Sequence, residues 1–227
     1  MIPETQNKNN QTVTIPEHFS YLCKATKTGV LRFLSHREWI TATERTMRRA
    51  SFPLWFTQGF HPKPKLTFSR ALPTGLISQA IYFVVRLSKT ELSTGELMKS
   101  FNAKSPRGLK IKGMWQMKPG EKINKYLDLW SFRILIKDQL DDKKIEEITQ
   151  MIQKRAFDDR CVILDKSFFM IEYKTVEKKW LDYRDIMQTL YGERFPRLFY
   201  LPILREVYLK RESCIPVSDV FDLHGRQ

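Results

Sequence analysis

The sequence predicts an α+β protein made of two ferredoxin-like units in tandem. After a polar leader, strand-like and helix-like patterns follow one another in the order β-α-β-β-α-β, which is the element order of a ferredoxin-like unit. The section after Pro119-Gly120 repeats that order with weaker patterns. We therefore expect a disordered leader at 1–17, a basic ferredoxin-like domain at 18–119, a neutral ferredoxin-like domain at 120–212 and a tail at 213–227.

In the first unit, a capping box marks the clearest helix start. The Ser35 hydroxyl can accept a hydrogen bond from the Glu38 amide, and the Glu38 carboxylate can reach back to the Ser35 amide. This predicts a helix from residue 35 to about 50, and a second helix is expected over 91–101 with Leu92 on its apolar side. Strand-like patterns cover 21–34 (two strands with a turn at 26–29), 54–58, 66–68, 81–87 and 109–117.

The second unit shows the same alternation. A strand is expected over 130–136, followed by a helix over 141–157 with apolar residues at helical spacing. Residues 162–173 resemble a hairpin that turns at Asp165-Lys166. A helix over 181–191, closed by Gly192, and an extended segment over 198–208 complete the unit.

Composition narrows the class of protein. The longest apolar runs are too short to span a bilayer, and the first ten residues lack the basic start and apolar core of a signal peptide. The three cysteines form no CxxC pair and imply no disulfide framework. We expect a cytoplasmic protein with no membrane partner.

Charge is the most informative bulk property. Residues 20–119 carry 18 Lys and Arg against 4 Asp and Glu, a net charge of +14, whereas the rest of the chain carries 21 of each. A unit this basic is typical of proteins that meet phosphate groups. The sequence therefore predicts a polyanion, above all RNA, as the partner of the first unit.

The helix expected at 35–50 has two distinct sides. At 100° per residue its apolar positions fall on one arc and face the core. The opposite arc carries four arginines, whose guanidinium groups bind phosphate oxygens in bidentate fashion. Glu44 can neutralise part of this side by pairing with Arg48, and an ordinary solvated helix surface is the alternative. The arginines are Arg37, Arg45, Arg48 and Arg49.

The loop Gly59–Lys65 contains a glycine and two prolines and cannot be regular structure. Phe60 can stack on a base, and Lys63 and Lys65 can bind phosphate. The prolines hold the lysines extended, which lowers the entropic cost of binding. The alternative is a structural crossover with Phe60 in the core.

His36 and His61 could act together as acid and base or as metal ligands. His36 lies in the first turn of a helix, which disfavours its protonated form. No third ligand is suitably spaced, and the alternative is two ordinary histidines. We assign no catalytic residue, no metal and no cofactor.

Residues 27–75 resemble a known family, the radical-SAM-linked proteins of unknown function, which are fused to or encoded beside cobalamin-binding radical SAM proteins. The resemblance rests on Lys27-Thr28-Gly29, on the run Leu31–His36 and on Glu44-Arg45 with Arg48-Arg49. It continues through Pro53-Leu54, Gly59–Lys65, and Ala71-Leu72-Pro73 with Gly75 and Ser78. Beyond residue 120 only Asp182-Tyr183-Arg184 aligns.

The chain departs from the family pattern in three places. Glu38 stands where the family usually has Asp, and His61 stands where it usually has Asn. Gln79-Ala80 follows Ser78 where an acidic pair is usual, so any chemistry of those acids is lost here. The CxxxCxxC motif of radical SAM enzymes is absent, so the chain cannot hold that iron–sulfur cluster itself.

The resemblance implies an accessory role beside a separate radical SAM protein. Combined with the charge, it predicts an accessory protein whose basic domain binds RNA or another polyanion. The alternatives are an adaptor that docks an acidic partner protein, and an RNA-processing enzyme that uses His36 or His61. The residues expected to contact the anion are Arg32, His36, Arg37, Arg45, Arg48, Arg49, Phe60, His61, Lys63, Lys65 and Arg70.

Overall fold

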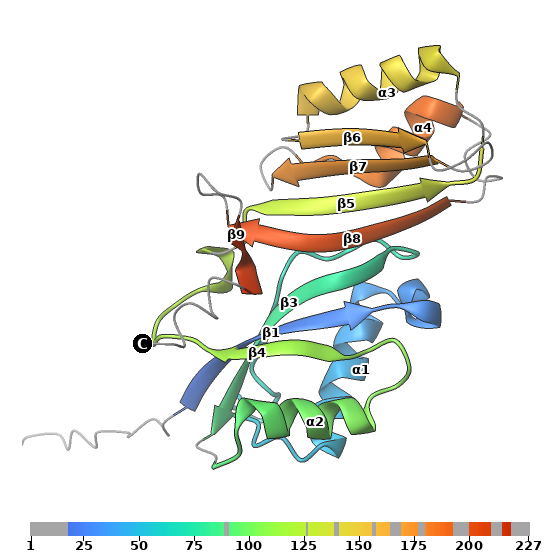
Figure 1. Cartoon of the computed structure of the whole chain (residues 1–227). Helices are drawn as coiled ribbons and strands as arrows, with labels where there is room; N and C mark the ends of the chain where they lie inside the picture. Colours follow the sequence, from blue (N-terminus) through green and yellow to red (C-terminus); the bar gives the residue numbers. More distant parts are fainter. Residues whose placement is uncertain are drawn as a thin grey trace, which may run out of the picture.

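A computed structural model shows a mixed α+β architecture (Figure 1). It describes residues 18–88, 91–125, 127–138, 141–155, 158–163, 169–176, 180–192, 200–209 and 215–218. The predicted leader at 1–17, the hairpin turn at Asp165-Lys166 and most of the predicted tail lie outside these ranges.

The first half of the chain follows the predicted order. Its elements are β1 (His18–Lys27), the 3-10 helix η1 (Gly29–Phe33), α1 (His36–Arg49), β2 (Leu66–Phe68), β3 (Ile77–Ser88), α2 (Thr94–Lys104) and β4 (Ile111–Gln116). A second 3-10 helix, η2 (Ile123–Lys125), lies in the connection to the second half.

The second half repeats the order and adds a short strand. Its elements are β5 (Leu129–Ile136), α3 (Asp142–Arg155), β6 (Asp158–Ile163), β7 (Phe169–Val176), α4 (Tyr183–Tyr191), β8 (Tyr200–Leu209) and β9 (Ile215–Pro216). The predicted closure of the helix by a glycine is confirmed, because Gly192 caps α4 with φ of 50°.

All the named strands belong to one sheet, in which seven follow the order β4-β1-β3-β8-β5-β7-β6. β2 pairs with β3, and β9 pairs with β8. Each half therefore places its first strand between its fourth and its third. The halves meet where β3 and β8 run parallel, paired at Ile77 with Ile203 and at Ser78 with Leu204.

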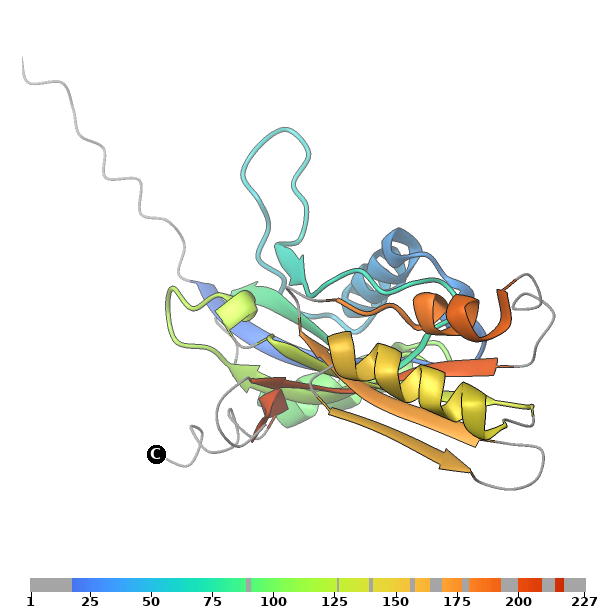
Figure 2. The ribbon, with the colours of Figure 1, turned by 90° about the horizontal axis from the view of Figure 1, so that it is seen from above.

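The sheet has two different sides. Figure 1 shows α1 and α4 behind the sheet, and Figure 2 shows the turquoise loop before β2 rising on that same side. β9 lies on the opposite side in Figure 2. Because side chains alternate along a strand, each strand contributes to both sides.

Aromatic packing fixes the helices on the sheet. In the first half, Trp39 of α1 meets Phe68 and Phe83 edge-on, with ring centroids 5.7 and 6.1 Å apart. In the second half, Tyr183 of α4 lies against Tyr200 of β8 with ring centroids 6.1 Å apart, and Phe132 stacks on Tyr173 within the sheet at 5.3 Å. Such pairs stabilise a core beyond the simple burial of their area.

Three expected elements differ from the structure. The strand expected at 54–58 is not formed, because only Leu54 and Phe56 make isolated bridges there, to Leu87 and Pro64. Residues 29–33 form η1 and not a strand, because local bonds from Leu31 N to Thr28 O and from Leu34 N to Leu31 O close tight turns. The second helix begins after a Ser93 cap, so Leu92 precedes it and is 48% exposed. The apolar residues Val30, Leu31 and Phe33 suggest a strand, which explains the error over residues 29–33.

No helix among the described residues is long and apolar enough to cross a membrane. Within the same ranges, no group of three or more His, Cys, Asp or Glu side chains is placed to hold a metal ion.

Candidate functional site: a helix and a loop on one side of the sheet

The capping box predicted for α1 is present. Ser35 Oγ accepts from Glu38 N at 3.3 Å, and Ser35 N donates to Glu38 Oε2 at 2.8 Å. Hydrogen bonds from the Ser35 side chain and backbone to the Glu38 carboxylate lower the pKa of that carboxyl, because they favour its charged form. The first turn of the helix is therefore fixed, and with it the direction in which every later side chain of α1 points.

The apolar side of α1 faces the sheet as predicted. Trp39, Thr43 and Met47 are buried, and Ala50 follows them at the end of the helix. Burying this arc leaves the opposite one in solvent. The exposed residues include Arg37, Arg45, Arg48 and Arg49.

The four arginines differ in how much of their charge is engaged. Arg48 pairs with Glu44 at 2.9 Å and lies over the Phe56 ring at 5.2 Å, which confirms the predicted i,i+4 pair. Arg49 donates to Thr46 Oγ1 at 3.0 Å. The side chains of Arg37 and Arg45 make no hydrogen bond or ion pair with the rest of the described chain, so their guanidinium groups are open to a ligand.

The loop Gly59–Lys65 is held at its base by backbone hydrogen bonds. Thr57 N donates to Lys63 O at 2.8 Å, and Lys65 N donates to Trp55 O at 3.0 Å. Lys63 N also donates to Thr57 Oγ1 at 3.1 Å. These bonds hold the two arms of the loop together, and the loop projects well beyond the sheet on the side of α1 and α4 (Figure 2).

Phe60 occupies this tip with a relative exposure of 102%. The expectation of a core position for Phe60, which was the alternative to stacking, is therefore wrong. His61, Lys63 and Lys65 are exposed beside it, and Lys65 Nζ lies 5.9 Å from the Trp55 ring. The loop thus presents an aromatic ring, an imidazole and two ammonium groups to solvent.

His36 lies apart from this loop, at the start of α1. It packs edge-on against Phe68 at 6.0 Å. Burial lowers the pKa of His36, and the charge of nearby Lys27 lowers it further. No described contact joins His36 to His61.

The neighbouring Lys27 is unusual because it is only 2% exposed. Its Nζ donates to Leu34 O at 2.6 Å, and burial lowers its pKa while the charge of Glu38 opposes that shift. Lys27 therefore ties the end of β1 to the start of α1. It was part of the family resemblance but was not among the expected site residues.

The two remaining predicted cations lie away from the loop. Arg32 is in η1, where its guanidinium lies 4.6 Å from the Phe33 ring and its Nε is buried without a hydrogen-bond partner. The guanidinium of Arg70 lies 4.3 Å from the ring of Trp180, which belongs to the second half. The residues predicted to contact an anion therefore lie in three places. The four arginines of α1 and the loop residues form one group, Arg32 and His36 lie near the N-terminal end of α1, and Arg70 lies at the boundary between the two halves.

We call the first of these groups the helix–loop surface. Arg48 links its two parts, because this residue of α1 contacts Phe56 at the base of the loop. The surface consists of Arg37, Arg45, Arg48 and Arg49 with loop residues Phe60, His61, Lys63 and Lys65.

Sequence reasoning missed a second surface, a cleft of about 940 Å³ on the other side of the sheet. Its lining draws on both halves, including Lys24 and Thr26 of β1, Lys174 of β7 and Arg205 of β8. The available signal was the alternation of polar residues along these strands. These residues come from two halves that are far apart in the sequence, so no local sequence pattern predicts that they line one cleft.

Comparison with known proteins places the chain in a family without assigning an activity. Two solved structures resemble it at low identity. One is described as an unknown protein from Galdieria sulphuraria, with 9% identity, coverage of 83% of this chain and 99% of that one, and a TM-score of 0.27. The other is a putative glycine cleavage system transcriptional repressor, with 8% identity, coverage of 82% and 96%, and a TM-score of 0.27.

No curated protein matches the chain. A family model described as "Uncharacterized protein conserved in bacteria (DUF2344)" matches residues 20–213. None of these matches carries a link to radical SAM proteins, so that part of the expected resemblance stays a prediction. Because the family model covers most of the sequence, the chain belongs to the uncharacterised bacterial family DUF2344.

Proposed function

We propose that this protein binds RNA through the helix–loop surface. The observation that carries the proposal is Phe60, a fully exposed aromatic ring at the tip of a loop whose base is tied by backbone bonds. Base–aromatic stacking contributes about 1–3 kcal/mol per base, and a ring already held in solvent is available for it.

The charge around the ring supports a phosphate-bearing partner. Residues 45–90 contain eight Lys and Arg and no Asp or Glu. Arg37 and Arg45 are exposed without partners in the described structure, and Lys63 and Lys65 are exposed on the same loop as Phe60. A single strand of RNA offers both a stacked base and the phosphates that these cations bind.

The test measures binding of a fluorescent single-stranded oligouridine at several salt concentrations by anisotropy. The wild-type affinity should fall steeply with salt, because each neutralised phosphate releases counterions. The double variant Arg37→Ala/Arg45→Ala should lower the slope of log K against log salt by about 1.4. Phe60→Ala should weaken binding by about 1–3 kcal/mol with little change in that slope.

A matched control removes the same charge elsewhere. Lys143 and Lys154 are exposed on α3 in the other half of the molecule, so Lys143→Ala/Lys154→Ala should leave the slope unchanged. Equal losses in the two double variants would show that bulk charge alone attracts RNA. Salt-insensitive binding, or no binding, would reject the proposal.

The accessory role beside a radical SAM protein is the part of the proposal that rests on the family resemblance. It predicts that the tagged protein co-purifies with a radical SAM protein from its own cells in the presence of nuclease. If the radical SAM protein is recovered only when the RNA is intact, the result would instead indicate that both proteins bind the same transcript.

We also infer that the chain comprises two ferredoxin-like units that share one sheet. The strand orders support this inference: β4-β1-β3 with β2 outside it, and β8-β5-β7-β6. Both orders place the four strands of a β-α-β-β-α-β unit in the ferredoxin-like arrangement. The RNA surface then belongs to the helix layer and loops of the first unit alone.

A further inference from the structure

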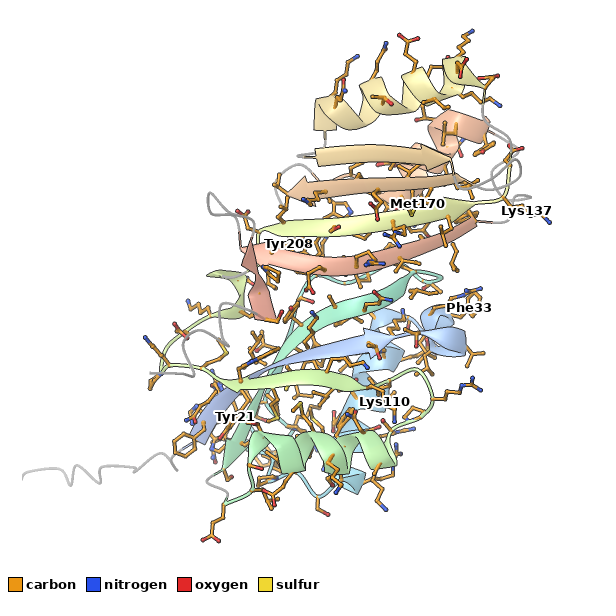
Figure 3. All side chains as sticks on the ribbon, in the orientation of Figure 1. Tyr21, Phe33, Lys110, Lys137, Met170 and Tyr208 are labelled. Carbon is orange, nitrogen blue, oxygen red and sulfur yellow. The ribbon has the colours of Figure 1, made fainter. Side chains whose placement is uncertain are left out.

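The cleft on the other side of the sheet is a second surface with its own chemistry. Two of its lining residues are labelled in Figure 3: Lys110, just before β4 in the first half, and Tyr208 on β8 in the second. Pro216 of β9 also lines it. The cleft therefore spans the line where β3 and β8 join the two halves.

Strand alternation separates the cleft from the helix–loop surface. Cys23 pairs with Phe83, which packs against Trp39 of α1, so these side chains face α1. The adjacent Lys24 and Tyr82 must then face away from α1. Lys24 lines the cleft, so a ligand in the cleft and one on the helix–loop surface lie on opposite sides of the sheet.

Among the described residues, five cationic side chains and two carboxylates line the cleft, and both carboxylates are already paired. Glu206 forms an ion pair with Lys24 and accepts from the Tyr82 hydroxyl at 3.0 Å. Glu172 accepts from Arg133 Nε at 2.7 Å. These acids therefore compete weakly with an incoming anion for the remaining cations.

Several of the remaining cations keep their charge for a ligand. Lys112 and Arg205 are exposed and have no hydrogen bond or ion pair from their side chains within the described ranges. Lys110 Nζ donates to Asn102 O, a neutral acceptor that leaves its charge uncompensated. Ammonium and guanidinium groups that line one cleft favour the oxygens of phosphate groups.

We propose that this cleft binds a compact ligand that carries several phosphate groups. Its volume of about 940 Å³ lies near the upper end of the ~300–1,000 Å³ range of small-molecule sites. The lining is polar, and Gln79, Thr28 and Ser131 add groups that can hydrogen-bond a ligand. The proposal does not rest on RNA binding at the helix–loop surface.

The test titrates the full-length protein with inorganic tripolyphosphate and with adenosine 5′-triphosphate in a calorimeter at low salt. Lys112→Ala/Arg205→Ala should weaken binding of both probes by about tenfold or more, because two charge-assisted contacts are lost. Neither residue has a described partner, so the variant should fold normally, which a thermal melt checks.

Lys143→Ala/Lys154→Ala removes the same charge from α3 and should leave both affinities unchanged. If the wild-type protein binds neither probe, or if both double variants lose affinity equally, the proposal is overturned. Arg37→Ala/Arg45→Ala should retain probe binding even if it loses RNA, so the two proposals fail separately.

A third arm identifies the source of the phosphates. Tripolyphosphate that leaves bound oligouridine in place indicates a free small molecule as the ligand of the cleft. Displacement of oligouridine by tripolyphosphate, with loss of RNA binding in Lys112→Ala/Arg205→Ala, indicates that the phosphates of an RNA strand occupy the cleft. Both results support a phosphate site there and differ in what fills it.

Discussion

Replacing Trp39 with alanine is expected to lower the free energy of unfolding by about 3–5 kcal/mol. The indole is 1% exposed and contacts the rings of Phe68 and Phe83, which belong to β2 and β3. Removing it leaves a cavity between α1 and the sheet that neighbouring side chains can fill only in part. Chemical denaturation followed by circular dichroism measures the loss.

The size of this effect tests whether Trp39 anchors α1 to the sheet. Trp180 offers a comparison in the other half, because it contacts Trp130 and Phe132 but remains partly exposed. Trp180→Ala should therefore cost less than Trp39→Ala. If Trp39→Ala loses less than about 1 kcal/mol, the packing of α1 described here is incorrect.

Gly108→Ala should destabilise the protein by about 2–5 kcal/mol, which combines backbone strain with a steric clash. Gly108 has φ of +100°, and a Cβ there would lie 2.3 Å from the carbonyl oxygen of Thr28. The Gly108 carbonyl accepts from Thr28 N at 3.0 Å and from Thr26 Oγ1 at 3.1 Å. The segments around Thr28 and Gly108 therefore cannot move apart without losing these bonds.

Gly95→Ala is the matched control for that change. Gly95 lies within α2, has no positive φ, and a Cβ there would meet only Ser93 Oγ at 3.8 Å. Alanine should stabilise the protein by roughly 0.5–1 kcal/mol at such a position. The two glycine substitutions should thus have opposite signs in the same denaturation assay, and a stabilising Gly108→Ala would contradict the described contact.

The sequence predicts the start of a helix well where a capping side chain marks it. Ser35 and Glu38 placed the start of α1 correctly because a capping box involves only neighbouring residues. Ser93 and Glu96 form the same box at α2, yet the helix was expected from residue 91, three residues before its start at Thr94. The misassigned residues 29–33 show that a run of five is too short for its periodicity to decide.

The exposure of Arg37, Arg45 and the loop lysines also followed from the pattern of the sequence, because one apolar arc of a helix defines the other. The position of Phe60 did not, since an aromatic residue between a glycine and a proline suits a core or a tip equally well. The cleft could not be predicted, because Lys112 and Arg205 line one cleft only through the pairing of β3 with β8, which no local pattern encodes.

The short pairing between β3 and β8 has a mechanical consequence. Two residue pairs join these strands, whereas eight join β5 to β8. Interstrand hydrogen bonds resist the twisting of a sheet, so we expect this seam to yield more easily than the pairing of β5 with β8. Twisting at this seam would change the distance between Lys112 and Arg205. A ligand that contacts both residues would oppose that motion and make the sheet more rigid.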